Sequence, residues 1–186
     1  MAYGVVLLPD RTTADALVEL SHAIGRDADP INLLGDHAPP HVSVLHLDVP
    51  DERAGEIADF ARAHPVRLTV RIIGLLYAPM PAGDHYVPQG GCYAGIEVVR
   101  RPDLDAVHQR FLAWAGERAM HPLGAVGADY RPHVTLAQTA AQPALPPYGR
   151  IPLGEFEATL ASGPIGPYGT FPSLGRRGAT GHSAEA

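Results

Sequence analysis

Two short stretches of the chain share one pattern, which joins a histidine to a hydroxyl residue. Residues 39–44 read Pro-Pro-His-Val-Ser-Val, and residues 131–136 read Arg-Pro-His-Val-Thr-Leu. Both contain proline, histidine, an apolar residue, serine or threonine, and a second apolar residue. The chain has ten histidines among 186 residues, so a single histidine followed two positions later by serine or threonine is unremarkable. Two copies with the same flanks indicate a repeated functional element.

The spacing inside each copy predicts a strand that carries the histidine and the hydroxyl on one face. Side chains alternate along a strand, so His41 shares a face with Ser43, and His133 shares a face with Thr135. If the two strands face one cleft, they bring two imidazoles and two hydroxyls together. Imidazole titrates near neutral pH, so one ring can act as a base and the other as an acid. Hydroxyls can donate hydrogen bonds to phosphate oxygens. The pattern therefore favours acid–base chemistry on a phosphate ester.

The paired motifs resemble those of the two-histidine (2H) phosphoesterase superfamily, which includes 2′,3′-cyclic nucleotide phosphodiesterases and bacterial 2′-5′ RNA ligase-like proteins. Residues 130–137, Tyr-Arg-Pro-His-Val-Thr-Leu-Ala, carry the resemblance most clearly. The order of the expected elements agrees with that family over about residues 2–172. The resemblance implies an α+β fold with two lobes, in which two pseudo-symmetric antiparallel sheets carry helices on the outside.

The same resemblance implies roles for four residues and a reaction without a metal or any other cofactor. His133 would activate water, and His41 would protonate the leaving oxygen. Ser43 and Thr135 would hold the phosphate. The first motif has serine where the family commonly has threonine, and the hydroxyl is kept.

Three further residues are candidates for substrate binding, each with an ordinary structural alternative. Tyr3 lies on the first predicted strand, where family members often place a pocket residue, and is equally well explained as a strand aromatic. Arg131 could clamp a phosphate, although Pro132 interrupts the strand there and favours a solvent-facing arginine. Tyr168, like Phe171, follows a Gly/Pro turn and would stack on a base or belong to a lid or the core.

Other residues of reactive type receive structural interpretations. His46 lies five positions after His41, so strict alternation places it on the opposite strand face in a structural or surface role. His37, His41 and His46 do not share a face, and no carboxylate or cysteine completes a ligand set, so we expect no metal site. Cys92 begins an apolar strand and is expected to be buried and inert.

The remaining pattern predicts one unit used twice, each time with a helix and a histidine-bearing strand. We expect a single two-lobed domain over residues 1–174 and a disordered tail over residues 175–186. Apolar runs predict strands, and 3.6-residue periodicity predicts helices. The predicted strands are 3–9, 41–49, 66–77, 92–99, 133–138 and 156–161, and the predicted helices are 10–24, 51–64 and 102–120.

Composition restricts the partners. The net charge is −6, and all 14 basic residues are arginine. This balance argues against binding long nucleic acid and disfavours an RNA end, but it allows a small phosphate ester or nucleotide in a locally positive pocket. No apolar run is long enough to span a membrane, the N-terminus lacks signal-peptide features, and a single cysteine excludes an internal disulfide. We expect a cytoplasmic monomer.

The expected function is a metal-independent phosphodiesterase that opens a cyclic phosphate of the 2′,3′-cyclic nucleotide type or cleaves a 2′-5′ phosphodiester. Two alternatives stay open. The same fold could act on a specialised metabolite that is not a nucleotide. It could also bind a nucleotide or an RNA end without turnover, although binding alone does not require both histidines.

Overall fold

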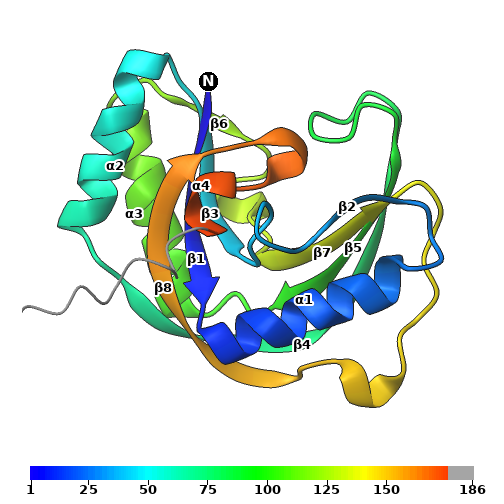
Figure 1. Cartoon of the computed structure of the whole chain (residues 1–186). Helices are drawn as coiled ribbons and strands as arrows, with labels where there is room; N and C mark the ends of the chain where they lie inside the picture. The colour runs from blue at the N-terminus through cyan, green and yellow to red at the C-terminus, as the bar shows by residue number, and fades with distance from the viewer. Residues whose placement is uncertain (176–186) are drawn as a thin grey trace, which may run out of the picture.

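The computed structural model describes residues 1–175, which form one antiparallel sheet with helices against it (Figure 1). The strands are β1 (Ala2–Pro9), β2 (Pro30–Leu33), β3 (Val42–Asp48), β4 (Arg67–Met80), β5 (Gly91–Val98), β6 (His121–Leu123), β7 (His133–Thr139) and β8 (Gly154–Pro164). The helices are α1 (Arg11–Gly25), α2 (Ala54–Ala63), α3 (Pro102–Gly116) and α4 (Pro172–Gly175). The predicted tail falls outside the described residues, apart from Gly175, which ends α4.

The strand order has the symmetry that the repeated motif suggested. The eight strands run β2-β7-β5-β4-β8-β1-β3-β6, so the order reads the same from either edge when β1 is exchanged for β5, β3 for β7, β4 for β8 and β2 for β6. The two motif strands, β3 and β7, are therefore counterparts. This arrangement confirms the predicted α+β class with two related halves.

The two sheets that we expected are joined into one. Residues 67–72 of β4 pair with residues 154–159 of β8, and this pairing links the halves. The rest of β4 pairs with β5, and the rest of β8 pairs with β1. Each long strand thus serves both halves, and the sheet bends so that the two halves face one another (Figure 1).

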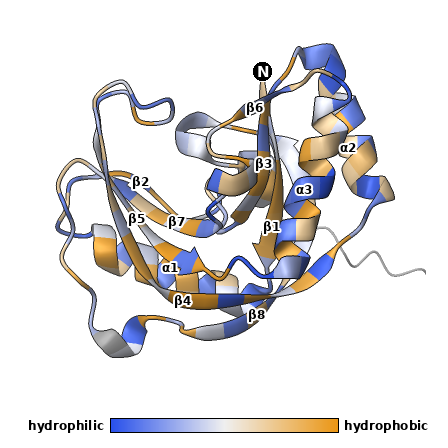
Figure 2. Ribbon diagram, turned by 180° about the vertical axis from the view of Figure 1, so that it is seen from behind, coloured by the Kyte–Doolittle hydropathy of each residue, from blue (hydrophilic) through white to orange (hydrophobic). Residues whose placement is uncertain are grey.

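The long helices that follow β1 and β5 each cover the motif strand of the opposite half. Helix α1 follows β1 and packs on β7, whereas α3 follows β5 and packs on β3. Helix α2 lies against β8 and β1. Apolar residues run along the strands beneath these helices (Figure 2). A helix that follows a strand of one half therefore covers the motif strand of the other half. This exchange fixes the two motif strands relative to each other. Among the described residues, no helix is long and apolar enough to cross a membrane.

Local sequence explains α1 well. The Asp10 side chain accepts a hydrogen bond from the backbone N–H of Thr13 at 3.0 Å and so caps the first turn. Leu17, Leu20 and Ile24 recur at helical spacing and are buried against the sheet. Each such side chain contributes about 2 kcal/mol on burial. The helix consequently has one face committed to the core.

Two edge strands were absent from the sequence prediction. Strand β2 has the sequence Pro-Ile-Asn-Leu and pairs with β7, and β6 has the sequence His-Pro-Leu and pairs with β3. Both are too short for an alternating pattern and contain a proline, which normally argues against a strand. They form because each follows a helix that returns the chain to the edge of a motif strand.

Candidate active site

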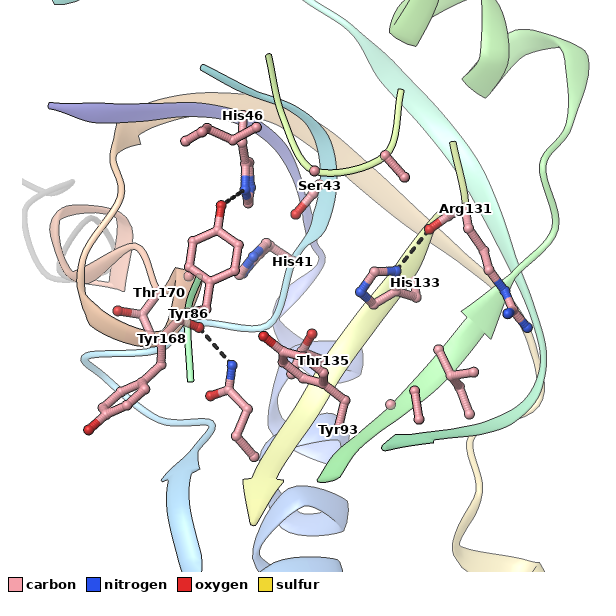
Figure 3. A pocket seen from close by; sticks show the side chains of 18 of the residues that line it. His41, Ser43, His46, Tyr86, Tyr93, Arg131, His133, Thr135, Tyr168 and Thr170 are labelled. Atoms are coloured by element: carbon pink, nitrogen blue, oxygen red, sulfur yellow. Dashed lines mark hydrogen bonds between the residues drawn. The ribbon is translucent and has the colours of Figure 1, made fainter. Parts of the chain in front are cut away.

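The structure brings the four motif side chains to one cleft between the two halves. His41 and Ser43 reach it from the β3 side, and His133 and Thr135 reach it from β7 (Figure 3). The cleft has a volume of about 400 Å³. The apolar residues between and after them are buried: Val42, Val134 and Leu136 do not line the cleft, and Val44 borders it. The alternation predicted for both motifs therefore holds where the histidine and the hydroxyl stand.

Both imidazole rings are held in the same orientation by a backbone carbonyl two residues earlier. His41 Nδ1 lies 2.9 Å from the carbonyl oxygen of Pro39, and His133 Nδ1 lies 2.8 Å from that of Arg131. A carbonyl oxygen only accepts, so Nδ1 must carry the proton in each case. In the neutral ring, Nε2 is then left unprotonated. The backbone of each motif thus reserves Nε2 for chemistry.

His41 sits in an apolar setting that disfavours its charged form. Its ring meets the edge of Phe171, with the ring centroids 4.8 Å apart. Gly4 makes room for Phe171, because a Cβ at Gly4 would collide with that ring. Burial lowers the pKa of His41 to about 4; the hydrogen bond to Pro39 opposes the shift, and the nearby charge of His133 adds to it. His41 is therefore neutral at physiological pH.

A β-bulge in each motif strand changes which face the later residues occupy. Along β3, Ser43 pairs with Val6 and Leu45 pairs with Val5, so Val44 is left without a partner. This extra residue reverses the alternation and turns His46 toward the cleft, which it lines. Our prediction that His46 lies on the opposite face was therefore wrong.

Strand β7 contains the matching bulge. Thr135 pairs with Gly95 and Ala137 pairs with Ala94, so Leu136 is left out of register. Gln138 is brought to the cleft as a result. It stands three positions after its hydroxyl residue, just as His46 does. The two halves therefore repeat a third polar position as well as the histidine and the hydroxyl.

The bulge in β3 is held by a histidine of the opposite half. His108 on α3 donates from Nδ1 to the carbonyl of Val44 at 2.7 Å, and its Nε2 accepts the backbone N–H of Gly127 at 2.9 Å. The ring also stacks on Tyr130 at 3.9 Å between centroids, and the Tyr130 hydroxyl donates to the carbonyl of Ser43 at 2.8 Å. The backbone beneath the first hydroxyl is therefore fixed from α3 and the loop after β6.

The bulge in β7 is held in the corresponding way by a serine. The Ser21 hydroxyl on α1 donates to the carbonyl of Leu136 at 2.6 Å and accepts the backbone N–H of Leu34 at 3.0 Å. Ser21 is fully buried. A polar side chain of each long helix thus satisfies the carbonyl that the bulge removes from the sheet ladder.

The structure gives the three further candidates for substrate binding, Tyr3, Arg131 and Tyr168, three different positions. Tyr3 belongs to the hydrophobic core and does not line the cleft, so that prediction was wrong. Arg131 lies at the cleft edge, but its guanidinium pairs with Glu97 at 3.0 Å and turns away from the histidines (Figure 3). Tyr168 lines the cleft. Phe171 is fully buried and packs on His41, as a core residue would.

Several polar residues of the cleft were missed from the sequence. Asp84 and Tyr86 come from the loop between β4 and β5, Tyr93 comes from β5, and Gln138 comes from β7. The polar residue five positions after each motif histidine was a usable signal for Gln138 and His46. The loop residues carry no such pattern, because only the folded chain brings them to the cleft.

Two further expectations concern metal ligands and cysteine. Within residues 1–175, no group of three or more His, Cys, Asp or Glu side chains is arranged to hold a metal ion. Cys92 is a free cysteine, buried on β5, and burial raises the pKa of its thiol. That placement suits the structural role that we predicted for Cys92.

Comparison with known proteins adds evidence on the fold. No protein-family model matches the chain, and no curated protein matches it. Among solved structures, the chain is similar to TT0787 of Thermus thermophilus, with a TM-score of 0.50 and 18% sequence identity. The similarity covers 91% of this chain and 92% of that one. At this identity the similarity shows a shared fold over nearly the whole chain.

Proposed function

We propose that this protein hydrolyses a phosphodiester by acid–base catalysis between His41 and His133. The substrate type that fits best is a cyclic phosphate such as a 2′,3′-cyclic nucleotide, with a 2′-5′ phosphodiester as the related linear form. One observation carries the proposal: two imidazoles of matching orientation, each with Nδ1 engaged and Nε2 reserved, share a cleft with two hydroxyls. The proposal agrees with the resemblance of the two motifs to the 2H phosphoesterases.

The electrostatic setting favours His41 as the base. A neutral imidazole can accept a proton through Nε2, and burial keeps His41 neutral. His41 would take a proton from water as the water oxygen attacks phosphorus. The bond from phosphorus to one ester oxygen breaks, and His133 Nε2–H gives its proton to that oxygen. This assignment reverses the order of roles that the family resemblance implies.

The hydroxyls of Ser43 and Thr135 supply donors for the non-bridging phosphate oxygens. Negative charge builds on these oxygens during attack, and fixed donors stabilise it without reorganising. The carbonyl of Ser43 is bonded to Tyr130, and the bulge next to Thr135 is bonded to Ser21, so both hydroxyls stand on constrained backbone. Neither role requires a metal or another cofactor.

A second candidate keeps the same chemistry and changes the substrate to a specialised phosphate ester outside the nucleotides. The net charge of −6 and the ion pair that occupies Arg131 favour a small substrate over an RNA end. Among the described residues, Arg131 is the one arginine that lines the cleft. This candidate predicts no turnover of nucleotides and histidine-dependent turnover of another phosphodiester.

Hydrolysis of 2′,3′-cyclic nucleotides in the presence of EDTA tests the proposal. Phosphorus NMR would follow the products of the wild type and of His41→Ala and His133→Ala. Each loss of a proton-transfer group should lower kcat by about a hundredfold or more. His121→Ala, at an exposed position on the edge strand β6, is the matched control and should keep full activity. Turnover that EDTA abolishes, or that survives both substitutions, would exclude the proposed mechanism.

A further inference from the structure

Among the described residues, two side-chain polar atoms are buried without a hydrogen-bond partner, and both belong to the cleft. They are Nε2 of His46 and Oε1 of Gln138. Each residue stands three positions after the hydroxyl residue of its motif strand, Ser43 or Thr135, and each is turned to the cleft by a bulge. The two atoms therefore occupy equivalent places in the two halves.

A buried polar atom without a hydrogen-bond partner lowers the stability of the fold. The presence of two such atoms at equivalent places is therefore informative. A buried polar atom without a partner costs about 1–3 kcal/mol, and folded proteins leave few of them. The other polar atoms of both side chains are well bonded. His46 Nδ1 lies 2.8 Å from the Tyr86 hydroxyl, and the Gln138 amide nitrogen donates to the carbonyl of Tyr168 at 2.8 Å. Each side chain is thus held in place with one polar atom left over.

The hydrogen bonds of the two side chains indicate whether each unpartnered atom is a donor or an acceptor. Among the described residues, His46 Nδ1 is the hydrogen-bond partner of the Tyr86 hydroxyl; when the hydroxyl donates to Nδ1, the ring proton is on Nε2 as a free donor. The Tyr168 carbonyl only accepts, so the amide of Gln138 is oriented with its oxygen free as an acceptor. Burial lowers the pKa of His46 to about 3, with the charges of His41, His133 and His85 adding to the effect, so the ring is uncharged. The pair suits a neutral, polar group.

The position along the strands sets the size of that group. Three strand residues span about 10 Å, so the pair stands about one nucleoside length from the hydroxyls that would hold the phosphate. The rings of Tyr86 and Tyr93 line the same cleft and offer flat apolar surface. The wall beside the two atoms includes loop residues, since Tyr86 precedes β5 and Tyr168 follows β8. Tyr168 adopts a left-handed backbone conformation, with φ of 62°.

Resting on the proposed function, we propose that His46 and Gln138 form the subsite that recognises the organic part of the substrate. This part is a neutral group of nucleoside size with a hydrogen-bond acceptor for His46 Nε2–H and an N–H or O–H donor for Gln138 Oε1. Both atoms are enclosed by the wall of the cleft, so the group reaches them through a shift of the wall that keeps the hydrogen bonds of His46 to Tyr86 and of Gln138 to Tyr168. The subsite determines which phosphodiester is used, and the histidine pair performs the reaction.

The test compares a substrate that has such a group with one that lacks it. Kinetics would be measured on uridine 2′,3′-cyclic phosphate and on ethylene cyclic phosphate, which has the reacting ring alone. In Gln138→Met and His46→Phe, kcat/KM for the nucleotide relative to ethylene phosphate should fall about 3- to 10-fold, mainly through KM, as expected for one neutral hydrogen bond. Tyr77→Phe, which removes a hydrogen bond to Ala144 outside the cleft, should leave the ratio unchanged. An unchanged ratio in both cleft variants overturns the subsite.

Binding separates failure of the subsite from failure of the proposed function. Calorimetry would measure the Kd of uridine 2′,3′-cyclic phosphate for His133→Ala, with and without Gln138→Met. If the wild type turns over neither substrate but Gln138→Met weakens binding 3- to 10-fold, the hydrolase proposal fails and the subsite stands. Equal Kd values, or no binding at millimolar nucleotide, overturn the subsite.

Discussion

At the scale of single residues, the site depends on how each imidazole is oriented and charged. His41 and His133 use the carbonyl two positions earlier in the same way, yet the apolar contact with Phe171 distinguishes the His41 ring. The pair of motifs could be found from the sequence, because residue type and spacing suffice for it. The charge state could not, since it depends on Phe171, 130 residues away along the chain from His41.

The pH dependence of kcat/KM should show the lowered pKa of His41, on which its role as the base rests. A base must be unprotonated, and burial lowers the pKa of His41 to about 4. If His41 is the base, kcat/KM in the free enzyme rises through about pH 4 and has reached its plateau before pH 6. An acidic limb that lies near the ordinary imidazole pKa of about 6.5 would contradict the lowered pKa of His41 and remove the ground for its assignment as the base. The measurement is the pH–rate profile on a cyclic nucleotide, with protein stability checked at each pH.

Removal of the second hydroxyl should slow the reaction without unfolding the protein. Thr135→Val preserves shape and loses the donor to a charged phosphate oxygen, an interaction worth about 1.5–3 kcal/mol. We expect kcat to fall about 10- to 100-fold, whereas Thr135→Ser keeps the hydroxyl and should stay within a few-fold of the wild type. Steady-state kinetics on the three proteins decide the point. Equal activity of the valine and serine variants would show that the Thr135 hydroxyl has no role in the reaction.

At the scale of elements, the bulges decide which residues reach the cleft. The long strands and helices were predictable, because their apolar patterns are regular. The bulges at Val44 and Leu136 were not, because an alternating apolar pattern looks the same with or without an extra unpaired residue. Their positions are set by Ser21 and His108, which lie on helices of distant sequence. For this reason His46 was assigned to the wrong face.

Ser21→Ala should destabilise the fold, because it leaves the carbonyl of Leu136 and the N–H of Leu34 buried without their partner. The expected loss in the free energy of unfolding is about 1–3 kcal/mol, measured by urea denaturation at pH 7. Ser173→Ala, at an exposed position, is the control and should change stability by less than about 0.5 kcal/mol. Equal stability of the two variants would mean that Ser21 does not hold the bulge.

At the scale of the whole molecule, each half is completed by the other, and the cleft lies where they meet. This exchange places histidines in buried surroundings between the halves, so the stability of the whole fold should depend on pH in the acid range. The symmetry of the motifs predicted two related halves. The joining of both halves into one sheet through β4 and β8 had no sequence signal, because pairing between long strands is decided by packing.

The free energy of unfolding should fall as the pH drops from about 6.5 to about 4. Burial lowers the pKa values of His41 and His46 to about 4 and about 3, so the unfolded chain binds more protons than the folded one in this window. Stability therefore rises with pH there, by about 1.4 kcal/mol per pH unit for each histidine. His46→Gln should remove the contribution of one histidine to this pH dependence of the free energy of unfolding, as measured by urea denaturation at pH 7, 6 and 5. Parallel curves for wild type and variant over that range would refute the buried, neutral state of His46.

The central claim is that His41 and His133 act together in one transition state on a cyclic phosphodiester. The most direct measurement is kcat for hydrolysis of a 2′,3′-cyclic nucleotide by the wild type, His41→Ala, His133→Ala and the double variant, all shown to be folded. Groups that act as a unit are strongly non-additive, so the double variant should be little slower than either single variant, each of them about a hundredfold or more below the wild type. Full activity in either single variant, or losses that multiply in the double variant, would contradict the paired mechanism.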